Sequence, residues 1–197
     1  MWTRIKNFFL KLVLPTSKLL YPLSDKVAII VGHSRLADGA VAFDGTTEYN
    51  YNSNVAKKLT ELLGDKIVVF TKDYMGYSRI LELCQEYHIG TSIELHFNAA
   101  NKSAQGCECL VMSYTKLDIP RQLLSKISMQ YGMNNRGIKV LDSGIRGYNN
   151  LRSMMPLNSM IIEPFFGDNE SCAMILQDVD GYATIIADVL FPGRIKS

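Results

Sequence analysis

Two of the three histidines in the chain stand where an imidazole ring could take part in chemistry. His33 and His96 each follow a short apolar segment, and such a segment is typical of a buried strand. Asn98 comes two residues after His96 and would face the same way along an extended chain. His88 ends a predicted helix, where a protonated ring favours the helix dipole, so we interpret it as structural. His33 and His96 are therefore the candidates for catalysis or metal binding.

A catalytic zinc typically has three protein ligands from His and Asp or Glu, with water in the fourth position. If both histidines bind zinc, one Asp or Glu carboxylate is needed as the third ligand. Asp38, Asp44 and Glu48 all lie between the first predicted strand and the first predicted helix. Glu48 is nearest to the helix, but spacing alone does not decide between Glu48 and Asp44.

Glu163 stands between the apolar residues 160–162 and the segment 164–166, so water is expected to be scarce around it. An ionised carboxylate in apolar surroundings is costly unless it is paired or lies near a metal. Desolvation would raise its pKa toward the range that a general base needs. The alternative is an ion pair with a nearby arginine such as Arg152.

The elements that would position these side chains alternate along the chain. Short β-rich runs predict strands at residues 26–31, 66–70, 91–97, 107–114 and 159–166. Amphipathic stretches predict helices at residues 53–63, with a Ser cap, at 77–88, at 118–131, with Asp118 as cap, and at 170–190, with Gly181 weakening the middle. This order predicts an α/β domain with a twisted, mostly parallel sheet and helices on both faces. In such sheets function gathers at the carboxyl ends of the strands, where His33, His96 and Glu163 are expected.

The chain has 197 residues, 47% of them hydrophobic and 20% charged, as expected for one globular domain. A net charge of +2 gives no argument for nucleic acid. Residues 1–26 alone carry a net charge of +4, so a basic contact surface is expected only there. The four cysteines include no CxxC pair, which favours buried free thiols over disulfides.

Several segments, in order, resemble the zinc-dependent N-acetylmuramoyl-L-alanine amidases of type 3. That family's pattern runs Gly-His, Glu, Ser-x-His-x-Asn-Ala and Glu-x-Gly-Phe-x-x-Asn, with Arg-Gly-Val-Lys and Leu-Arg before the last strand. The matching segments here are Gly32-His33, Glu48, Ser92–Ala99, Arg136–Lys139, Leu151-Arg152 and Ile162–Asn169. Ser34-Arg35 replaces a Gly-Gly common in the family, Ser92 lies further from His96 than in the family's Ser-x-His, and Phe165 replaces a glycine. These departures concern the substrate cleft more than the metal site.

The resemblance implies the type 3 amidase fold, with Zn²⁺ held by His33, Glu48 and His96. It also implies Glu163 as catalytic base and Asn98 and Arg152 as substrate-binding residues. The substrate it implies is peptidoglycan, cut between the lactyl group of N-acetylmuramic acid and L-alanine. We accordingly divide the chain into a basic amphipathic segment, residues 1–25, and a catalytic domain, residues 26–192.

Three other interpretations remain open from the sequence. A zinc carboxypeptidase-like peptidase would need an arginine clamp, for which Arg146 or Arg152 would serve, and a wall-binding module would keep the fold without catalysis. A nucleotide-binding protein has little support, because GxGxxG and GxxxxGK[ST] are absent. A compact amidase domain with a basic, amphipathic start resembles a monomeric phage-type endolysin that is made in the cytoplasm and acts in the cell envelope; a bacterial cell-wall enzyme is the alternative. We expect no cleaved signal peptide and no spanning helix. Residues 1–20 would suit either a helix that packs on the sheet, with its basic face toward water, or contact with a membrane surface.

Overall fold

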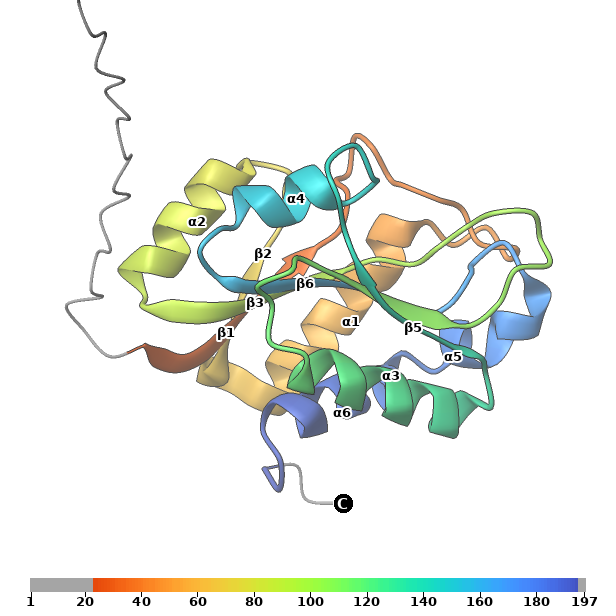
Figure 1. Ribbon diagram of the computed structural model, residues 1–197. Helices are drawn as coiled ribbons and strands as arrows, with labels where there is room; N and C mark the ends of the chain where they lie inside the picture. Colours follow the sequence, from red (N-terminus) through yellow and green to blue (C-terminus); the bar gives the residue numbers. More distant parts are fainter. Residues whose placement is uncertain (1–22, 195–197) are drawn as a thin grey trace, which may run out of the picture.

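The computed structural model describes residues 23–194, which form one six-stranded sheet between two layers of helices (Figure 1). The strand order is β2-β1-β3-β6-β4-β5. The strands are β1 (Ser24–Val31), β2 (Ile67–Phe70), β3 (Ile89–Leu95), β4 (Cys107–Val111), β5 (Asn135–Val140) and β6 (Asn158–Glu163).

All neighbouring pairs are parallel except β4 and β6, which run antiparallel. The carboxyl ends of β1, β3 and β6 therefore meet at one edge of the sheet. This confirms the predicted α/β class with a mostly parallel sheet.

The sheet is covered on both faces (Figure 1). One face packs against α1 (Glu48–Leu63), α3 (Asp118–Tyr131), α5 (Ala173–Gln177) and α6 (Val179–Leu190), and the other against α2 (Tyr77–Glu86) and α4 (Tyr148–Ser153). Two short 3₁₀ turns, Gly64–Lys66 and Glu170–Cys172, complete the described elements. Burial on both faces explains why the central strands read as continuous apolar runs.

The larger core layer joins alternate side chains of the strands to the first group of helices. On β3, Ile93 and Leu95 point into it, and Phe97 follows on the same side. The intervening residues, Glu94 and His96, therefore face the α2 and α4 side of the sheet. All four cysteines are buried and free, as the sequence indicates.

Two predicted helices and one predicted cap differ from the structure, and α2 ends at Glu86 rather than at residue 88. Helix α1 begins at Glu48 rather than at residue 53, because Thr47 is the N-cap and accepts a hydrogen bond from Asn50 N. Helix α3 is preceded by Leu117, and Asp118 is its first residue rather than a side-chain cap. The C-terminal helix is broken at Asp178, whose carboxylate caps α6 by accepting from Gly181 N, so Gly181 lies in a first turn and not mid-helix.

Two elements were missed because they carry too weak a pattern. Strand β5 lies at the sheet edge, with four of its six residues exposed, so it lacks an apolar run. Helix α4 has six residues, of which only Leu151 is buried, and this is too short to show a helical period.

The segment assigned to residues 1–25 lies almost wholly outside the described residues, although β1 begins at Ser24, two residues before its predicted start. Among the helices of residues 23–194, none has the length and apolar character needed to cross a membrane.

Candidate metal centre and active site

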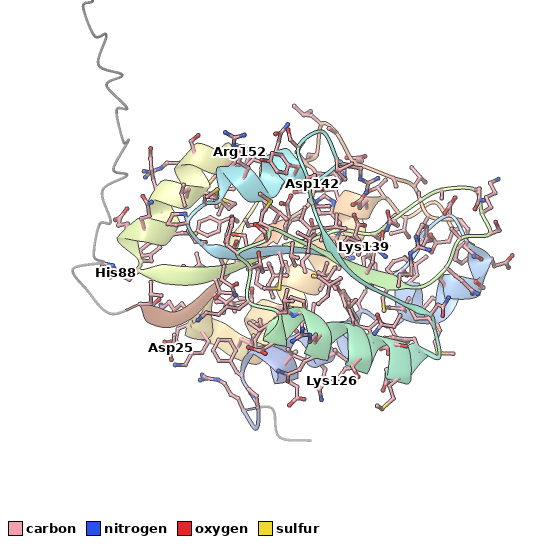
Figure 2. The ribbon with its side chains drawn as sticks, viewed as in Figure 1. Asp25, His88, Lys126, Lys139, Asp142 and Arg152 are labelled. Atoms are coloured by element: carbon pink, nitrogen blue, oxygen red, sulfur yellow. The ribbon has the colours of Figure 1, made fainter. Side chains whose placement is uncertain are left out.

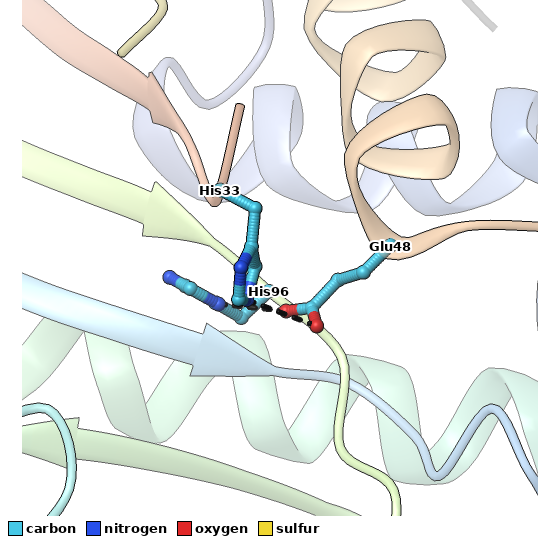
Figure 3. Close-up of side chains that lie close together, drawn as sticks. All are labelled: His33, Glu48 and His96. Atoms are coloured by element: carbon cyan, nitrogen blue, oxygen red, sulfur yellow. Dashed lines mark hydrogen bonds and ion pairs between the residues drawn. The ribbon is translucent and has the colours of Figure 1, made fainter. Parts of the chain in front are cut away.

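His33, Glu48 and His96 converge at the carboxyl edge of the sheet (Figure 3). His33 follows β1, His96 follows β3, and Glu48 opens α1. His33 Nε2 lies 3.1 Å from Glu48 Oε2, and His96 Nδ1 lies 2.7 Å from Glu48 Oε1. One ligand atom from each of the three residues lies within 4.8 Å of the others.

The structure also separates Glu48 from the acidic alternatives in the same loop. Asp44 is exposed, and its Oδ1 accepts a hydrogen bond from Thr46 N at 2.9 Å. Asp38 is exposed as well. Glu48 is the only one of the three that lies beside both histidines.

Local backbone features hold the three side chains in place. His33 adopts a left-handed conformation, with φ 63°, which turns the chain sharply after β1. Gly39, with φ 80°, passes so close that a Cβ there would lie 2.6 Å from Glu48 Oε2 and from His33 Cδ2. The backbone N–H groups of Ala40 and Phe97 donate to the two oxygens of Glu48, at 3.0 and 3.1 Å.

Burial alone would raise the pKa of Glu48, but hydrogen bonds from His33, His96 and Ala40 N hold it well below its usual range. Burial alone would lower the pKa of His96, but the carboxylates of Glu48 and Glu94 raise it to about 9. Glu48 is thus an ionised carboxylate at neutral pH between two imidazole rings, a donor set suited to a divalent cation.

Glu163 ends β6, next to β3, and its side chain is 2% exposed. Oε1 lies 3.1 Å from Arg146 Nη2, whereas the buried Oε2 has no hydrogen-bond partner. Burial raises the pKa of Glu163 to about 7, and the charge of Glu48 acts in the same direction while His96 and Arg146 oppose it. The arginine beside Glu163 is Arg146 and not Arg152, and this ion pair leaves one carboxylate oxygen available.

A cavity of about 260 Å³ brings these groups together. It is lined by His33, Glu48, His96, Arg146, Asn150 and Glu163, among others. A second cavity of about 410 Å³ adjoins it, since Leu110, Arg146 and Glu163 line both.

Asn98 lines the second cavity, where its amide donates to Glu108 at 2.8 Å. Lys139, on β5, lines the same cavity. Arg152 is exposed on α4 and lines neither of these two cavities (Figure 2). His88 lies just before β3, at the opposite end of that strand from His96 (Figure 2).

Sequence reasoning missed Glu94, Glu108, Arg146 as the partner of Glu163, and Asn150. Glu94 had a visible signal, because it is a charged residue inside an apolar strand two positions before His96. The others lie on elements or loops whose position across the sheet has no local pattern in the sequence.

The residues fit a zinc ion: two imidazole nitrogens and one carboxylate converge, and an unpartnered glutamate oxygen lies in the same cavity. A mostly parallel α/β sheet with this constellation at its carboxyl end is suited to metal-assisted hydrolysis. The family model of N-acetylmuramoyl-L-alanine amidases matches residues 27–190, so the chain belongs to that family. This confirms the resemblance seen in the motifs.

Solved structures agree with this assignment. The catalytic domain of the CD27L endolysin targeting Clostridium difficile is 26% identical, with a TM-score of 0.70, over 87% of this chain and 99% of that one. The catalytic domain of CwlV, an N-acetylmuramoyl-L-alanine amidase of Paenibacillus polymyxa, is 19% identical, with a TM-score of 0.69, over 84% of this chain and 96% of that one. The N-acetylmuramoyl-L-alanine amidase AmiC2 of Nostoc punctiforme is 15% identical, with a TM-score of 0.70, over 85% of this chain and 96% of that one. The last two show the shared fold, and comparison with curated proteins gives no match.

Proposed function

We propose that the chain uses Zn²⁺ to hydrolyse the amide between the lactyl group of N-acetylmuramic acid and L-alanine in peptidoglycan. The observation that carries this proposal is the His33, Glu48 and His96 cluster with Glu163 in the same cavity. Family membership supports the substrate, because the matching family is that of N-acetylmuramoyl-L-alanine amidases.

His33, Glu48 and His96 would hold the zinc. When bound, the ion lowers the pKa of a water molecule and stabilises negative charge on the carbonyl oxygen under attack. Glu163 accepts the proton of the attacking water at its unpartnered Oε2 and delivers it to the nitrogen of the departing L-alanine. A pKa of about 7 suits both halves of this transfer at neutral pH.

Asn98 would bind substrate in the second cavity, beside Glu108 and Lys139. Arg152 would contact only a part of the substrate that extends over α4, because its side chain is exposed outside the two cavities.

The test is metal analysis of the purified protein, combined with mass spectrometry of the fragments released from peptidoglycan. We expect one zinc per chain and peptides that begin with L-alanine. His96→Ala should lose metal and activity together, and Glu48→Ala should do the same while the matched Asp44→Ala protein keeps both. A fully zinc-loaded His96→Ala protein would contradict the ligand assignment. Release of C-terminal residues from free peptides, without activity on intact walls, would instead indicate a carboxypeptidase.

We further propose that the protein acts as a monomeric phage-type endolysin at the cell envelope. The likeness to the catalytic domain of the CD27L endolysin supports this role.

Residues 1–20 would bind an anionic membrane surface through interleaved basic and aromatic side chains. Deleting residues 1–20 should weaken binding to anionic vesicles and leave the melting temperature unchanged. A lower melting temperature with unchanged vesicle binding would show that the segment packs on the domain instead.

A further inference from the structure

Glu94 is a buried carboxylate with no part in the reaction proposed above. It is 2% exposed and lies on β3, on the sheet face covered by α2 and α4. Its Oε1 accepts hydrogen bonds from Tyr77 OH at 2.6 Å, Lys72 Nζ at 2.8 Å, His96 Nε2 at 3.0 Å and Asn150 Nδ2 at 3.3 Å. Such a concentration of donors on one oxygen makes Glu94 a fixed acceptor.

The ring of His96 lies between two carboxylates. Nδ1 faces Glu48, and Nε2 faces Glu94. A neutral imidazole carries one N–H and one bare nitrogen, and only the bare nitrogen can bind a metal. Both nitrogens face a carboxylate, so an acceptor fixed beside Nε2 keeps the proton there, and Nδ1, on the Glu48 side, is the nitrogen that loses its proton when the ion binds.

The backbone just after β1 adds a second constraint on this ring. A Cβ on Gly32 would lie 2.8 Å from both Cε1 and Nε2 of His96, so the chain passes directly against the ring edge. The ring is therefore confined by close packing on one side and by hydrogen bonds at both nitrogens.

We propose that Glu94 is a positioning residue of the metal centre: it holds the proton on His96 Nε2 and so presents Nδ1 to zinc. Tyr77 connects Glu94 to α2, and Lys72, Asn150 and His96 would still hold Glu94 in place if the Tyr77 hydroxyl were removed. A carboxylate that accepts from a metal-binding histidine fixes the ring and strengthens it as a ligand. This inference rests on the proposed zinc site.

The competing role is purely structural, since the same hydrogen bonds join the sheet to two helices. The two roles differ in what they predict for Tyr77. Tyr77→Phe removes one donor to Glu94 without touching His96, so a structural role predicts similar effects for Tyr77→Phe and Glu94→Ala. A positioning role predicts that only Glu94→Ala affects the metal.

The first measurement uses the unmodified protein. Long-range ¹H–¹⁵N spectra of its three imidazole rings report which nitrogen carries the proton, and a His88→Gln variant assists the assignment. In the zinc-loaded protein we expect His96 to be protonated at Nε2 and metal-bound at Nδ1. A metal-bound Nε2 would overturn the proposal, whatever any variant does.

The second measurement is zinc affinity by competition with a chromophoric chelator, with the melting temperature of each zinc-free variant recorded alongside. Glu94→Ala should bind zinc roughly 10- to 100-fold more weakly, whereas Tyr77→Phe should stay within about twofold of the parent. Equal losses in the two variants, or none in Glu94→Ala, would overturn the proposal. If Glu94→Ala does not fold, Glu94→Gln replaces it, and retention of parental affinity and tautomer by Glu94→Gln would show that an acceptor oxygen suffices. An unmodified protein that binds no zinc would instead refute the metal centre itself.

Discussion

Glu94 and Glu163 are both buried, lie on neighbouring strands and face the same side of the sheet, yet their surroundings differ. Four side-chain donors converge on Glu94, while Glu163 has Arg146 alone and one oxygen without a partner. Burial raises the pKa of a carboxyl group in both places. At Glu94, His96 and Lys72 overcome burial and hold the pKa at about 2, whereas at Glu163 burial prevails and the pKa is about 7.

The comparison shows that burial alone does not mark a catalytic carboxylate. A glutamate on which several donors converge stays ionised and holds its neighbours in place. A poorly partnered one exchanges a proton near neutral pH, which is what a general base must do.

The largest expected effect is on turnover, and it follows from the role of Glu163 as the proposed base. Glu163→Gln removes the proposed base but no zinc ligand, so kcat should fall by about 10²- to 10⁴-fold while zinc content and fold persist. Release of L-alanine-started peptides from purified peptidoglycan is the assay, and exposed Glu61→Gln, on α1, is the matched control. Parental turnover in a folded, zinc-loaded Glu163→Gln protein would end the proposed mechanism.

The two glutamates should also make the unfolding free energy depend on pH in opposite directions. The pKa of Glu163 rises from 4.5 to about 7 on folding, so the folded state binds the proton more tightly and loses stability as pH rises through that window. Relative to Glu163→Gln, the zinc-free parent should lose about 3 kcal/mol of unfolding free energy between about pH 4 and pH 8. The pKa of Glu94 is lowered to about 2, so its contribution is present above 4.5 and is lost as pH falls through 2.

Urea unfolding of the two zinc-free proteins at a series of pH values measures the difference. A free-energy difference that does not change across the window would show that Glu163 titrates normally in the folded protein.

The smallest expected effect concerns the ion pair between Arg146 and Glu163, which lowers the pKa of Glu163. Arg146→Ala removes the one side-chain donor to Glu163, so the pKa should rise further. The acid limb of the kcat/KM profile should then move up by roughly half to one pH unit. Arg121→Ala, an exposed change on α3 across the sheet, should leave the limb in place. A shift of equal size in both variants would point to overall charge rather than to this ion pair.

The sequence by itself was sufficient to predict the α/β class and the central strands, and to single out His33 and His96 as candidate site residues. Those strands are buried on both faces, so their apolar runs are strong, and His33 and His96 directly follow two of them. The motifs, spread over residues 26–190, also indicated the amidase family that the comparison confirmed.

What the sequence left open depended on distances between residues far apart in the chain. Glu48 and Asp44 have equivalent local patterns, and only the Thr47 cap and the position of α1 decided which carboxylate reaches the histidines. Arg146 and not Arg152 lies beside Glu163, because the loop before α4 passes the end of β6 while Arg152 stays exposed on the helix. The contrast between Glu94 and Glu163 likewise arises from donors on α2 and α4, on the loops that follow β2 and β3, and on the loop before α4. Local sequence sets the type and burial of a carboxylate, but its pKa depends on partners that only the tertiary structure brings within hydrogen-bond distance.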